Sequence, residues 1–584
     1  MSGTELGPEL PVIVPDESPF DGGETKELFP LDSYALHIAT RVIATAELLD
    51  LILSFIERID LAKTALVSQV WLEISRRHIW QEVENAWELF ALLAPLGPLR
   101  GHQGYEFERV PSHQDWLRFQ PFATRVRKLR IEGVSGEDDY TKVVSSLLSK
   151  LAYTRLWHPV LPNLKQLEWY QDEHLAQMSL FLHPGLEELI MYVPMHGLPG
   201  YTIETICDDI AWKAPNIRYL ELVPMESISS SPIEVALSSL LSHLDDSLQT
   251  LYLPIYGLTQ VVFETASRLQ HVKEIAFSTT QTPTVVALYS DVLVFTPHLE
   301  PNAFPALRKL SVSAPLADLI EILTNPDFPA SRITDFLVRA ARPETPAAVE
   351  DFHATVAREC GSLNIYSLVL SAPNDEKEEN ARWVESPSPD TALSWTTLAP
   401  LASAGSLRGL VSIAIAHEHA LKLSVHELAN FARALPTLEY LVCNPSPHAV
   451  GDIPPGIKLI ELGILADAMP RVETLELYVD ASDATIDYPA WSENQFPNLR
   501  NLWMGASPVH LERRKGISLF LAALLPLGAR IDTERWEIWD YVAPEARYAI
   551  EWDRIAEDVA LLMESRAVLA KAIMNVAKGR AICA

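Results

Sequence analysis

The spacing of hydrophobic residues divides the chain into four parts. Residues 1–33 show no periodicity and are rich in Pro, Gly and acidic residues, which predicts a flexible acidic tail. Residues 34–95 carry apolar side chains at helical spacing, and residues 120–507 repeat one short apolar pattern. Residues 508–584 return to helical spacing. We therefore expect a tail, a helical domain, a long repetitive domain and a C-terminal cap.

Three short helices are predicted in the helical domain. The first has one wide apolar face, formed by Leu48, Leu49, Ile52, Leu53, Phe55 and Ile56. Asp60 is suited to N-cap the second helix, which carries Leu61, and a third apolar series runs from Trp71 to Trp87. Three helices of this length cannot bury so much Leu, Ile and Trp alone, so they pack on the rest of the chain or on a partner.

The residue types in this domain follow one order: an acidic residue with Leu-Leu, Ile-Leu-x-Phe-Ile, Asp-Leu, Val-Ser-x-x-Trp and a closing Trp. These elements are Glu47, Leu48, Leu49, Ile52, Leu53, Phe55, Ile56, Asp60, Leu61, Val67, Ser68, Trp71 and Trp80. The segment AELLDLILSFIERIDLAKTALVSQVWLEISRRHIW therefore resembles an F-box. Ala44-Thr45 stand where an F-box usually has Leu-Pro. The alternative is an ordinary amphipathic hairpin that packs on its own chain.

A second pattern recurs through the repetitive domain, with apolar residues at the first, fourth and sixth positions. Its clearest copies are PNLKQLEW, PGLEELIM, PNIRYLEL, PALRKLSV, PTLEYLVC, PRVETLEL and PNLRNLWM. The copies recur at intervals of about 31 residues, near the upper end for leucine-rich repeats. A unit of this kind cannot bury its apolar face alone, whereas a stack of units buries a continuous core. The domain therefore resembles irregular leucine-rich repeats.

The segments between the copies fit helices on the other side of each unit. Ser424 and Glu427 form a predicted capping box ahead of one such helix, and residues 516–527 and 552–577 predict the helices of the cap. The expected fold class is thus α/β: a three-helix F-box, then a leucine-rich-repeat-like solenoid with a parallel concave sheet and a helical C-terminal cap. The alternative is a series of unrelated α/β domains.

Composition and charge narrow the function. The chain has 584 residues, 48% of them hydrophobic, and 46 basic against 77 acidic residues give a net charge of −31. This charge repels phosphate groups, so we expect no nucleic-acid partner and no binding to anionic membranes. Four widely spaced cysteines form no disulfide framework and no zinc motif. No signal peptide or spanning segment is evident, and we expect the chain in the cytoplasm, the nucleus or both.

Catalytic motifs are not found, and we expect no enzyme activity, no cofactor and no metal site. His417 and His419 would place two imidazoles on one side of a strand end, but no third metal ligand is evident. We interpret this pair as part of a solvent-facing loop. Cys360 has no partner histidine in view, which favours a buried structural thiol.

The repeat register predicts which side chains line the concave face. They lie two, four and six positions after the first apolar residue of each unit, and those we select are Glu168, Tyr170, Glu188, Tyr192, Tyr219, Glu221, Tyr252, Tyr440, Tyr478 and Trp503. Tyrosines interleaved with carboxylates suit protein recognition, and a basic peptide in particular, with the group from Tyr170 to Tyr252 as the first choice. The alternative is that tyrosine simply favours strands.

An F-box followed by leucine-rich repeats is the architecture of substrate receptors in cullin-RING ubiquitin ligases. The resemblance implies that a Skp1-like adaptor, and through it a cullin, binds Leu48, Leu49, Ile52, Leu53, Phe55, Ile56, Leu61, Val67, Trp71 and Trp80. The repeats would hold a protein substrate that the sequence does not identify. The alternatives are a repeat scaffold outside any ligase, and an enzyme with a dispersed site.

One acidic insertion interrupts the repeats between Ile365, taken as the first apolar residue of its unit, and Leu410. Loops of this length are usually functional or disordered. Ser386 and Ser388 each precede a proline there and are candidate sites of phosphorylation; the alternative is an unmodified linker.

Overall fold

The computed structural model describes residues 45–98, 105–132, 145–171, 175–193, 202–224, 231–278, 292–370, 388–403, 405, 407–447, 453–482, 495–533 and 548–582. The chain divides into two compact units, with the boundary between Trp80 and Gln81. The helical unit thus ends at Trp80, whereas the hydrophobic pattern suggested residue 95. The predicted tail, Ala44, Ser386 and Cys583 lie outside the described residues.

The first unit is a bundle of α2 (Ala46–Leu53), α3 (Arg58–Thr64) and α4 (Gln69–Ile79). Its core consists of Leu49, Leu53, Leu61 and Ile74. Ser68 caps α4 by accepting a hydrogen bond from the Trp71 N–H at 3.3 Å. The expected cap at Asp60 is wrong: α3 follows Glu57, and Asp60 lies in its first turn. There the positive end of the helix dipole stabilises its negative carboxylate, which also pairs with Lys63 Nζ at 2.6 Å.

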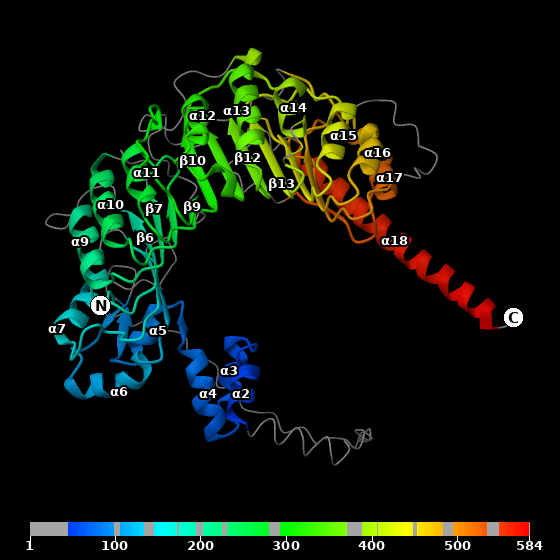
Figure 1. Ribbon diagram of the computed structural model, residues 1–584. Coiled ribbons are helices and arrows are strands. Elements are labelled where there is room, and N and C mark those ends of the chain that lie inside the picture. The colour runs from blue at the N-terminus through cyan, green and yellow to red at the C-terminus, as the bar shows by residue number, and fades with distance from the viewer. Residues whose placement is uncertain are drawn as a thin grey trace, which may run out of the picture. The chain divides into compact units, whose positions relative to one another are not determined.

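The second unit contains a fifteen-strand sheet in the part of the chain that is described, and every neighbouring pair is parallel (Figure 1). Its strands, which are neighbours in space in the order of the chain, are β1 (Glu82–Val83), β4 (Lys128–Glu132), β5 (Gln166–Tyr170), β6 (Glu188–Val193), β7 (Tyr219–Pro224), β8 (Thr250–Leu253), β9 (Glu274–Phe277), β10 (Lys309–Ala314), β11 (Asp335–Ala340), β12 (Ile365–Leu370), β13 (Ser412–His417), β14 (Tyr440–Cys443), β15 (Thr474–Leu477), β16 (Asn501–Trp503) and β17 (Arg530–Ile531). A separate antiparallel pair is formed by β2 (Leu96–Pro98) and β3 (Tyr105–Phe107). The predicted α/β solenoid is confirmed.

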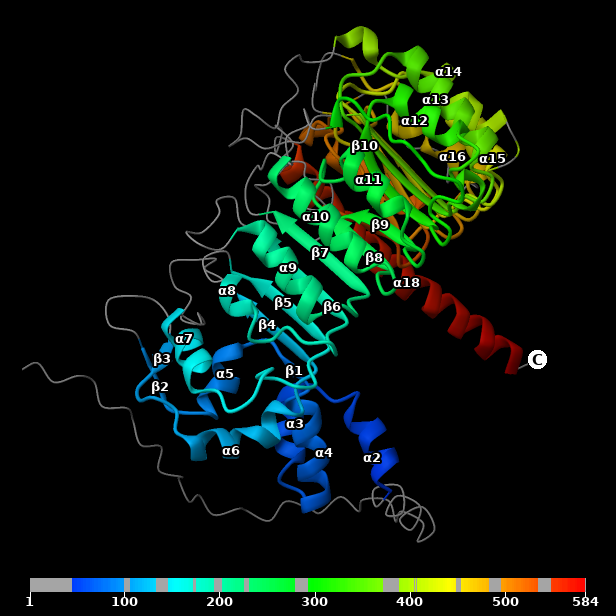
Figure 2. The same ribbon diagram turned by 60° about the vertical axis from the view of Figure 1, so that its left-hand side comes forward.

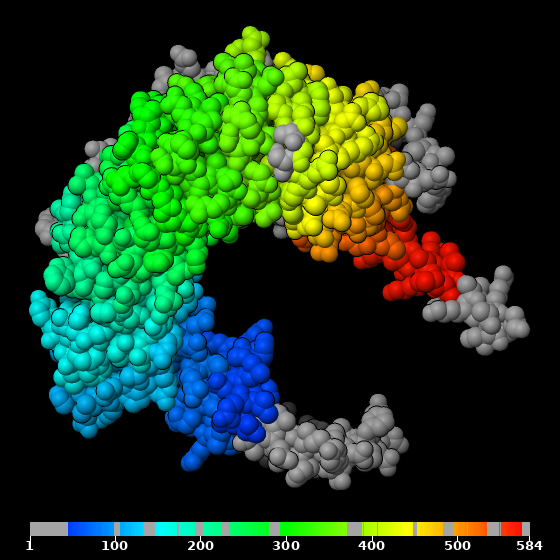
Figure 3. Space-filling view, in the orientation of Figure 1, coloured from blue at the N-terminus to red at the C-terminus, as the bar shows by residue number. Residues whose placement is uncertain are grey.

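Helices cover one face of this sheet and leave the other open (Figures 1 and 2). The helices of the unit are α5 (Ala86–Ala91), α6 (His113–Ala123), α7 (Ser145–Thr154), α8 (Leu175–Met178), α9 (Ile203–Lys213), α10 (Ser231–His243), α11 (Gln260–Ser267), α12 (Leu316–Thr324), α13 (Pro346–Glu359), α14 (Trp395–Ser403), α15 (Val425–Ala434), α16 (Leu462–Ala468), α17 (Arg514–Leu524) and α18 (Ala549–Ile582). The capping box of Ser424 and Glu427 is confirmed at the start of α15. Figure 3 shows the surface of this unit hollowed along the side that the strands line.

One buried residue from each strand forms a continuous apolar ladder against the helices. In register order these residues are Val83, Leu129, Leu167, Leu189, Leu220, Leu251, Ile275, Leu310, Phe336, Tyr366, Ile413, Leu441, Leu475, Leu502 and Ile531. Each fully buried Leu or Ile contributes about 1.5–3 kcal/mol, so the ladder is the principal reason why the repeats stack.

The register corrects one repeat. Ile365 pairs with Asp335 and Ser412 and is 39% exposed on the open face, so it is not the first apolar residue of its unit. Leu363, which is buried, takes that place. Both residues fit the spacing, and only the pairing with the neighbouring strands distinguishes them.

The C-terminal part of the unit ends in the long helix α18, whose first half packs on α17. Trp552 donates its indole N–H to the Ser507 carbonyl at 2.9 Å. Arg514 donates two hydrogen bonds to Asp558, at 2.6 and 2.7 Å. The second half of α18 has large apolar side chains that are exposed: Val568, Leu569, Ile573 and Met574.

Candidate protein-binding surfaces

The helical unit exposes an unusual amount of apolar surface. We call the following set the helical apolar surface: Leu48, Leu51, Ile52, Phe55, Ile59, Leu66, Val67 and Val70. Four of these residues, at positions 48, 51, 52 and 55, have the spacing of one stripe along α2 and its end. Phe55 is 82% exposed and Leu66 is 86% exposed, so these two side chains make little contact with the rest of the unit. Exposed apolar patches of this kind mark interaction sites.

The structure divides the predicted adaptor contacts into two groups. Leu48, Ile52, Phe55 and Val67 belong to the helical apolar surface, and Ile56, Trp71 and Trp80 are half-buried. Leu49, Leu53 and Leu61, which the resemblance assigns to the adaptor contact, instead fill the core of the bundle, so for these three the structure corrects the prediction. The pattern alone did not select Leu51, Ile59, Leu66 and Val70, although each is a large apolar residue in the same segment.

Polar contacts hold the three helices in place beneath this surface. The Asp50 carboxylate on α2 contacts His78 Nε2 at 2.9 Å and accepts from Arg77 at 3.4 Å, both on α4. The hydroxyls of Thr64 and Ser75, on α3 and α4, lie 2.9 Å apart. The apolar side chains are therefore presented by a bundle with its own core and its own polar links.

On the second unit, the predicted concave residues lie on the face opposite the helices. Parallel pairing aligns Glu168, Ile190, Glu221 and Tyr252 in one row, and Glu188 with Tyr219 in another. Tyr440 and Trp503 lie on the same open face, on β14 and β16, and Tyr478 directly follows β15. Among the tyrosines selected from the sequence, Tyr440 is the most exposed, at 39%.

The tyrosines of the N-terminal half are engaged with their own neighbours. The rings of Tyr170 and Tyr192 are 4.9 Å apart, and those of Tyr219 and Tyr252 are 5.3 Å apart. The Arg130 guanidinium lies 5.0 Å from the centre of the Tyr170 ring, in cation–π geometry. These rings pack across the strands in addition to forming a surface.

The carboxylates of this half are also satisfied within the protein. Glu168 accepts from Lys128 at 2.7 Å, and Glu221 accepts from Tyr219 at 2.6 Å and from Ser278 at 2.5 Å. Only 2% of Glu221 and 5% of Glu168 is exposed. Burial and the hydrogen bond to Glu221 raise the pKa of the Tyr219 hydroxyl, which keeps it a donor. The expectation that these two carboxylates bind a basic peptide is therefore wrong, because both are buried and already bonded within the protein. Glu188, in contrast, is exposed.

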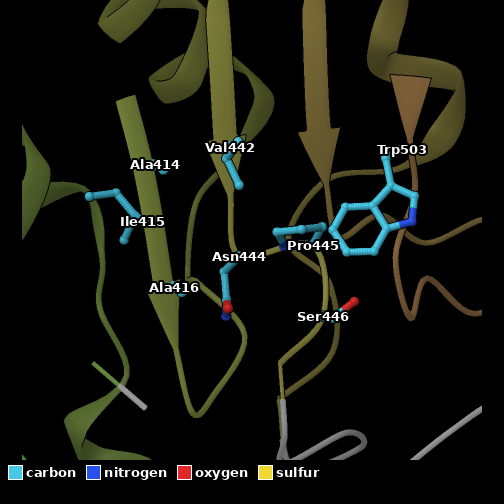
Figure 4. Close-up of a pocket in the computed structure, with 8 residues that line it drawn as sticks. All are labelled: Ala414, Ile415, Ala416, Val442, Asn444, Pro445, Ser446 and Trp503. Carbon is cyan, nitrogen blue, oxygen red and sulfur yellow. The ribbon is translucent and has the colours of Figure 1, made fainter. Parts of the chain in front are cut away.

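The C-terminal half of the open face has a hollow, which we call the Trp503 pocket (Figure 4). It is lined by Ala414, Ile415, Ala416, Val442, Asn444, Pro445, Ser446 and Trp503. Small side chains on β13 form one side and the Trp503 indole forms the other, with Val442 and Pro445 between them (Figure 4). Trp503 is 4% exposed, so it is a wall of the hollow and not a free anchor.

Close backbone packing fixes the shape of this pocket. Asn444 has a φ of 44°, and its side-chain amide accepts from the His417 N–H at 3.0 Å and donates to the His419 carbonyl at 2.8 Å. Gly505 has a φ of 49°, and a Cβ there would lie 2.0 Å from the Pro445 carbonyl oxygen. Only glycine allows this approach, which holds Pro445 and Ser446 beside β16.

The two histidines beside the pocket do not form a solvent-facing loop, and that interpretation is wrong. His417 and His419 are both buried, and His417 Nδ1 accepts from the His419 N–H at 2.9 Å. Burial lowers the pKa of His417 to about 4, so the ring is neutral at pH 7. Asn444 of the next repeat covers them, which the sequence pattern did not show. Among the described residues, no group of three His, Cys, Asp or Glu side chains is placed to hold a metal ion.

The three cysteines that the structure describes show no activation. Cys207, Cys360 and Cys443 are free and buried, and burial raises the pKa of each thiol to about 12. The expected burial of Cys360 is confirmed. None of the helices in the described ranges is long and apolar enough to cross a membrane.

Fold and surfaces together define an α/β solenoid of leucine-rich-repeat type, with a separate three-helix unit before it. No family model and no curated protein matches the chain. Among solved structures it is similar to a chain in the crystal structure of the Rad7 and Elc1 complex in yeast, with 13% identity and a TM-score of 0.38, covering 82% of this chain and 98% of that one. It is also similar to LegL7, a leucine-rich repeat-containing protein from Legionella pneumophila, with 10% identity and a TM-score of 0.28, covering 68% of this chain and 97% of that one.

Proposed function

We propose that the chain is the substrate-recognition subunit of a ubiquitin ligase of the Skp1–cullin–F-box type. The helical apolar surface binds a Skp1-like adaptor, which joins the chain to a cullin, and the open face of the repeats binds a protein substrate. The chain itself performs no bond chemistry. It brings a substrate lysine close to the loaded conjugating enzyme, which raises the effective concentration of the reacting groups. It acts in the cytoplasm, the nucleus or both.

The observation that carries the proposal is the helical apolar surface, because the unit already has a complete core beneath it. Each large apolar side chain contributes about 1.5–3 kcal/mol when fully buried, so four of them contribute about 6–12 kcal/mol. Association costs about 4–15 kcal/mol in lost rigid-body freedom. Most of the eight side chains must therefore be covered together, which requires one broad partner surface.

The proposal is tested with the full-length chain and purified Skp1 in isothermal titration calorimetry. The double variant Phe55→Ala with Val67→Ala removes two exposed side chains and should abolish binding. Trp212→Ala removes an equally exposed apolar side chain from the second unit and should bind as wild type does. Undiminished binding by the double variant would mean that the helical apolar surface is not the adaptor site.

The departure at Ala44-Thr45 favours one second candidate, a repeat scaffold that works outside a ligase. Reconstitution with Skp1, cullin and RING protein separates the two. Assembly of all four components supports the ligase subunit, and binding of other partners in their place supports the scaffold.

A further inference from the structure

One arginine near the middle of the sheet sets this part of the open face apart. Arg339 lies on β11, where the register pairs it with Ser313 on β10 and Val369 on β12. Val338 and Ala340, on either side of it in the chain, are buried on the side of the helices, so Arg339 points to the open face. Only 7% of Arg339 is exposed, and a charged side chain is thus mostly removed from water.

Other basic side chains on the same face are matched by carboxylates. Lys128 Nζ lies 2.7 Å from a carboxylate oxygen of Glu168, and Lys309 Nζ lies 3.5 Å from one of Glu274. Among the residues that the structure describes, Arg339 has no such ion pair, and its guanidinium donates no hydrogen bond. Buried charges in proteins are normally paired, because it is costly to remove a lone charge from water. The charge of Arg339 therefore indicates a ligand of opposite charge.

The strands around Arg339 place no negative charge beside it. Its row on β10 to β13 contains Ser313, Val369 and Ala416, and the row two residues earlier carries the hydroxyls of Ser311 and Ser367. Neither row contains an Asp or a Glu on these four strands.

More distant charges have little effect at this position. Asp335 is on the open side of the same strand, but it lies four residues away, about 13 Å along the strand, and Lys309 pairs with it. At physiological salt, charges interact little beyond about 8 Å. The chemistry within that range of Arg339 thus favours an anion, although the net charge of the whole chain is −31.

An oxyanion suits this position better than water does. Water accepts a hydrogen bond from the guanidinium but brings no opposing charge. A carboxylate or a phosphate ester neutralises the guanidinium and accepts from two of its N–H groups at once. The nitrogens of Arg339 are not among the enclosed, unpartnered polar atoms of the described chain, so they keep contact with solvent on the open side.

We propose that Arg339 binds an anionic side chain of the substrate, either a carboxylate or a phosphate ester, on the open face of the repeats. The guanidinium holds the oxyanion by two parallel hydrogen bonds, and the neighbouring strands β10 and β12 contribute no competing charge. The sequence pattern predicts a basic peptide on the strands from Tyr170 to Tyr252, whereas this site selects the opposite charge further along the sheet. The inference rests on the proposed function, because it names the class of substrate that the repeats select.

The test uses the full-length chain and four capped pentapeptides, acetyl-Gly-Gly-X-Gly-Gly-amide, with X as Glu, phosphoserine, Gln or Lys. Saturation-transfer NMR should show contact for the Glu peptide, the phosphoserine peptide or both, and the tighter of the two identifies the source of the oxyanion. Nonspecific attraction to a chain of charge −31 would instead favour the Lys peptide. No signal from either anionic peptide, or equal signals from the Gln or Lys peptide, would overturn the proposal.

Three variants assign the signal to Arg339. Arg339→Gln removes the charge and should weaken binding of the anionic peptides by at least about tenfold. Arg339→Lys keeps a charge without the paired donors and should bind these peptides more tightly than Arg339→Gln does. Lys309→Gln is the matched control, because it removes from the same face a charge that carboxylates already hold, and it should bind as wild type does. Equal binding by wild type and Arg339→Gln, or equal losses in Arg339→Gln and Lys309→Gln, would contradict the assignment.

Thermal unfolding of the free proteins tests for a purely structural role. Arg339→Gln should unfold at the same or a higher temperature than wild type, because the substitution removes a lone charge from a buried position. A large fall in the unfolding temperature would show that the guanidinium is held within the fold, and it would overturn the site.

Skp1 binding is measured in parallel for every variant. Skp1 binding without binding of the anionic peptides overturns the Arg339 site and keeps the proposed function. Binding of the anionic peptides that is lost in Arg339→Gln, without Skp1 binding, keeps the site and overturns the ligase assignment.

Discussion

Tyr219 donates its hydroxyl to Glu221, two residues further along β7, at 2.6 Å, and Ser278 donates to the other carboxylate oxygen at 2.5 Å. The carboxylate is thereby bonded on both oxygens before any partner arrives. Because this arrangement is buried, its contribution is to the stability of the sheet and not to the capture of a basic ligand.

Replacing Glu221 should therefore affect folding. Glu221→Ala leaves the Tyr219 and Ser278 hydroxyls without their acceptor, and we expect a loss of about 1–3 kcal/mol in stability. Glu188→Ala removes an exposed carboxylate from the neighbouring strand and should change stability by less than about 0.5 kcal/mol. Thermal unfolding followed by circular dichroism compares the two, and equal midpoints would contradict the structural role of Glu221.

Substitutions of two leucines that lie close together on α2 should have different effects, one on folding and the other on binding. Leu53 is fully buried in the core of the helical unit, and Leu53→Ala should destabilise that unit by about 2–5 kcal/mol. Leu51 is 57% exposed, and Leu51→Ala should leave the unit folded while weakening Skp1 binding. Hydrogen exchange over residues 45–80, measured beside calorimetric binding, separates the effects. Rapid exchange in the Leu51 variant would place that side chain in the core.

The free energy of unfolding should decrease on mild acidification, because His353 is buried in its neutral form. The ring is fully buried, its Nδ1 donates to the Thr397 carbonyl at 2.6 Å, and burial lowers its pKa from 6.5 to about 4. Between these values the unfolded chain binds a proton that the folded chain does not. Above pH 6.5 the neutral ring therefore contributes about 3 kcal/mol to the free energy of unfolding, and this contribution is lost as the pH falls to 4.

His353→Asn keeps a donor for Thr397 but does not titrate. Between pH 7 and pH 4.5, the unfolding temperature of this variant should fall less than that of wild type. Parallel curves for the two proteins would show that His353 takes no part in the acid sensitivity.

Arg514 should control the docking of α18. Its guanidinium is bonded twice to Asp558, and both side chains are only about one-third exposed. Arg514→Ala should accelerate hydrogen exchange in residues 549–566, because it lowers the free energy of local opening there by about 1 kcal/mol. Lys571→Ala, on the exposed half of the same helix, is the matched control. Equal exchange in both variants would show that apolar packing alone docks α18.

The apolar ladder and the capping box at Ser424 were predictable because both depend on spacing within one repeat. Each Leu or Ile of the ladder faces the helices whatever its neighbours are, and the Ser and Glu of the cap are three residues apart. Local pattern therefore indicated the solenoid and the face on which most candidate residues lie.

Contacts between repeats were not predictable in the same way. Lys128 neutralises Glu168 from forty residues away, and Asn444 covers His417 from the next strand, so both contacts depend on the register of the pairing. The difference between Leu49 and Leu48 has a similar cause. Both fit an apolar stripe, and only the direction from which α3 and α4 approach decides which of the two is buried.

The phosphorylation hypothesis stays a prediction for Ser386, which is outside the described residues. Ser388 is described and exposed, and its Oγ accepts from the Asp390 N–H at 3.4 Å. A phosphate there would add about −1.5 to −2 charge beside Asp390.

A sheet whose strands follow one another in chain order without closing into a barrel has two edges, and in the described part of the chain these are β1 and β17, with two residues each. An edge strand offers free N–H and C=O groups on which another polypeptide can add a strand. Two residues give too few bonds to hold an added strand in register. Polymerisation of this unit end to end is thus disfavoured despite the length of its sheet, and its partners are directed to the faces of the molecule.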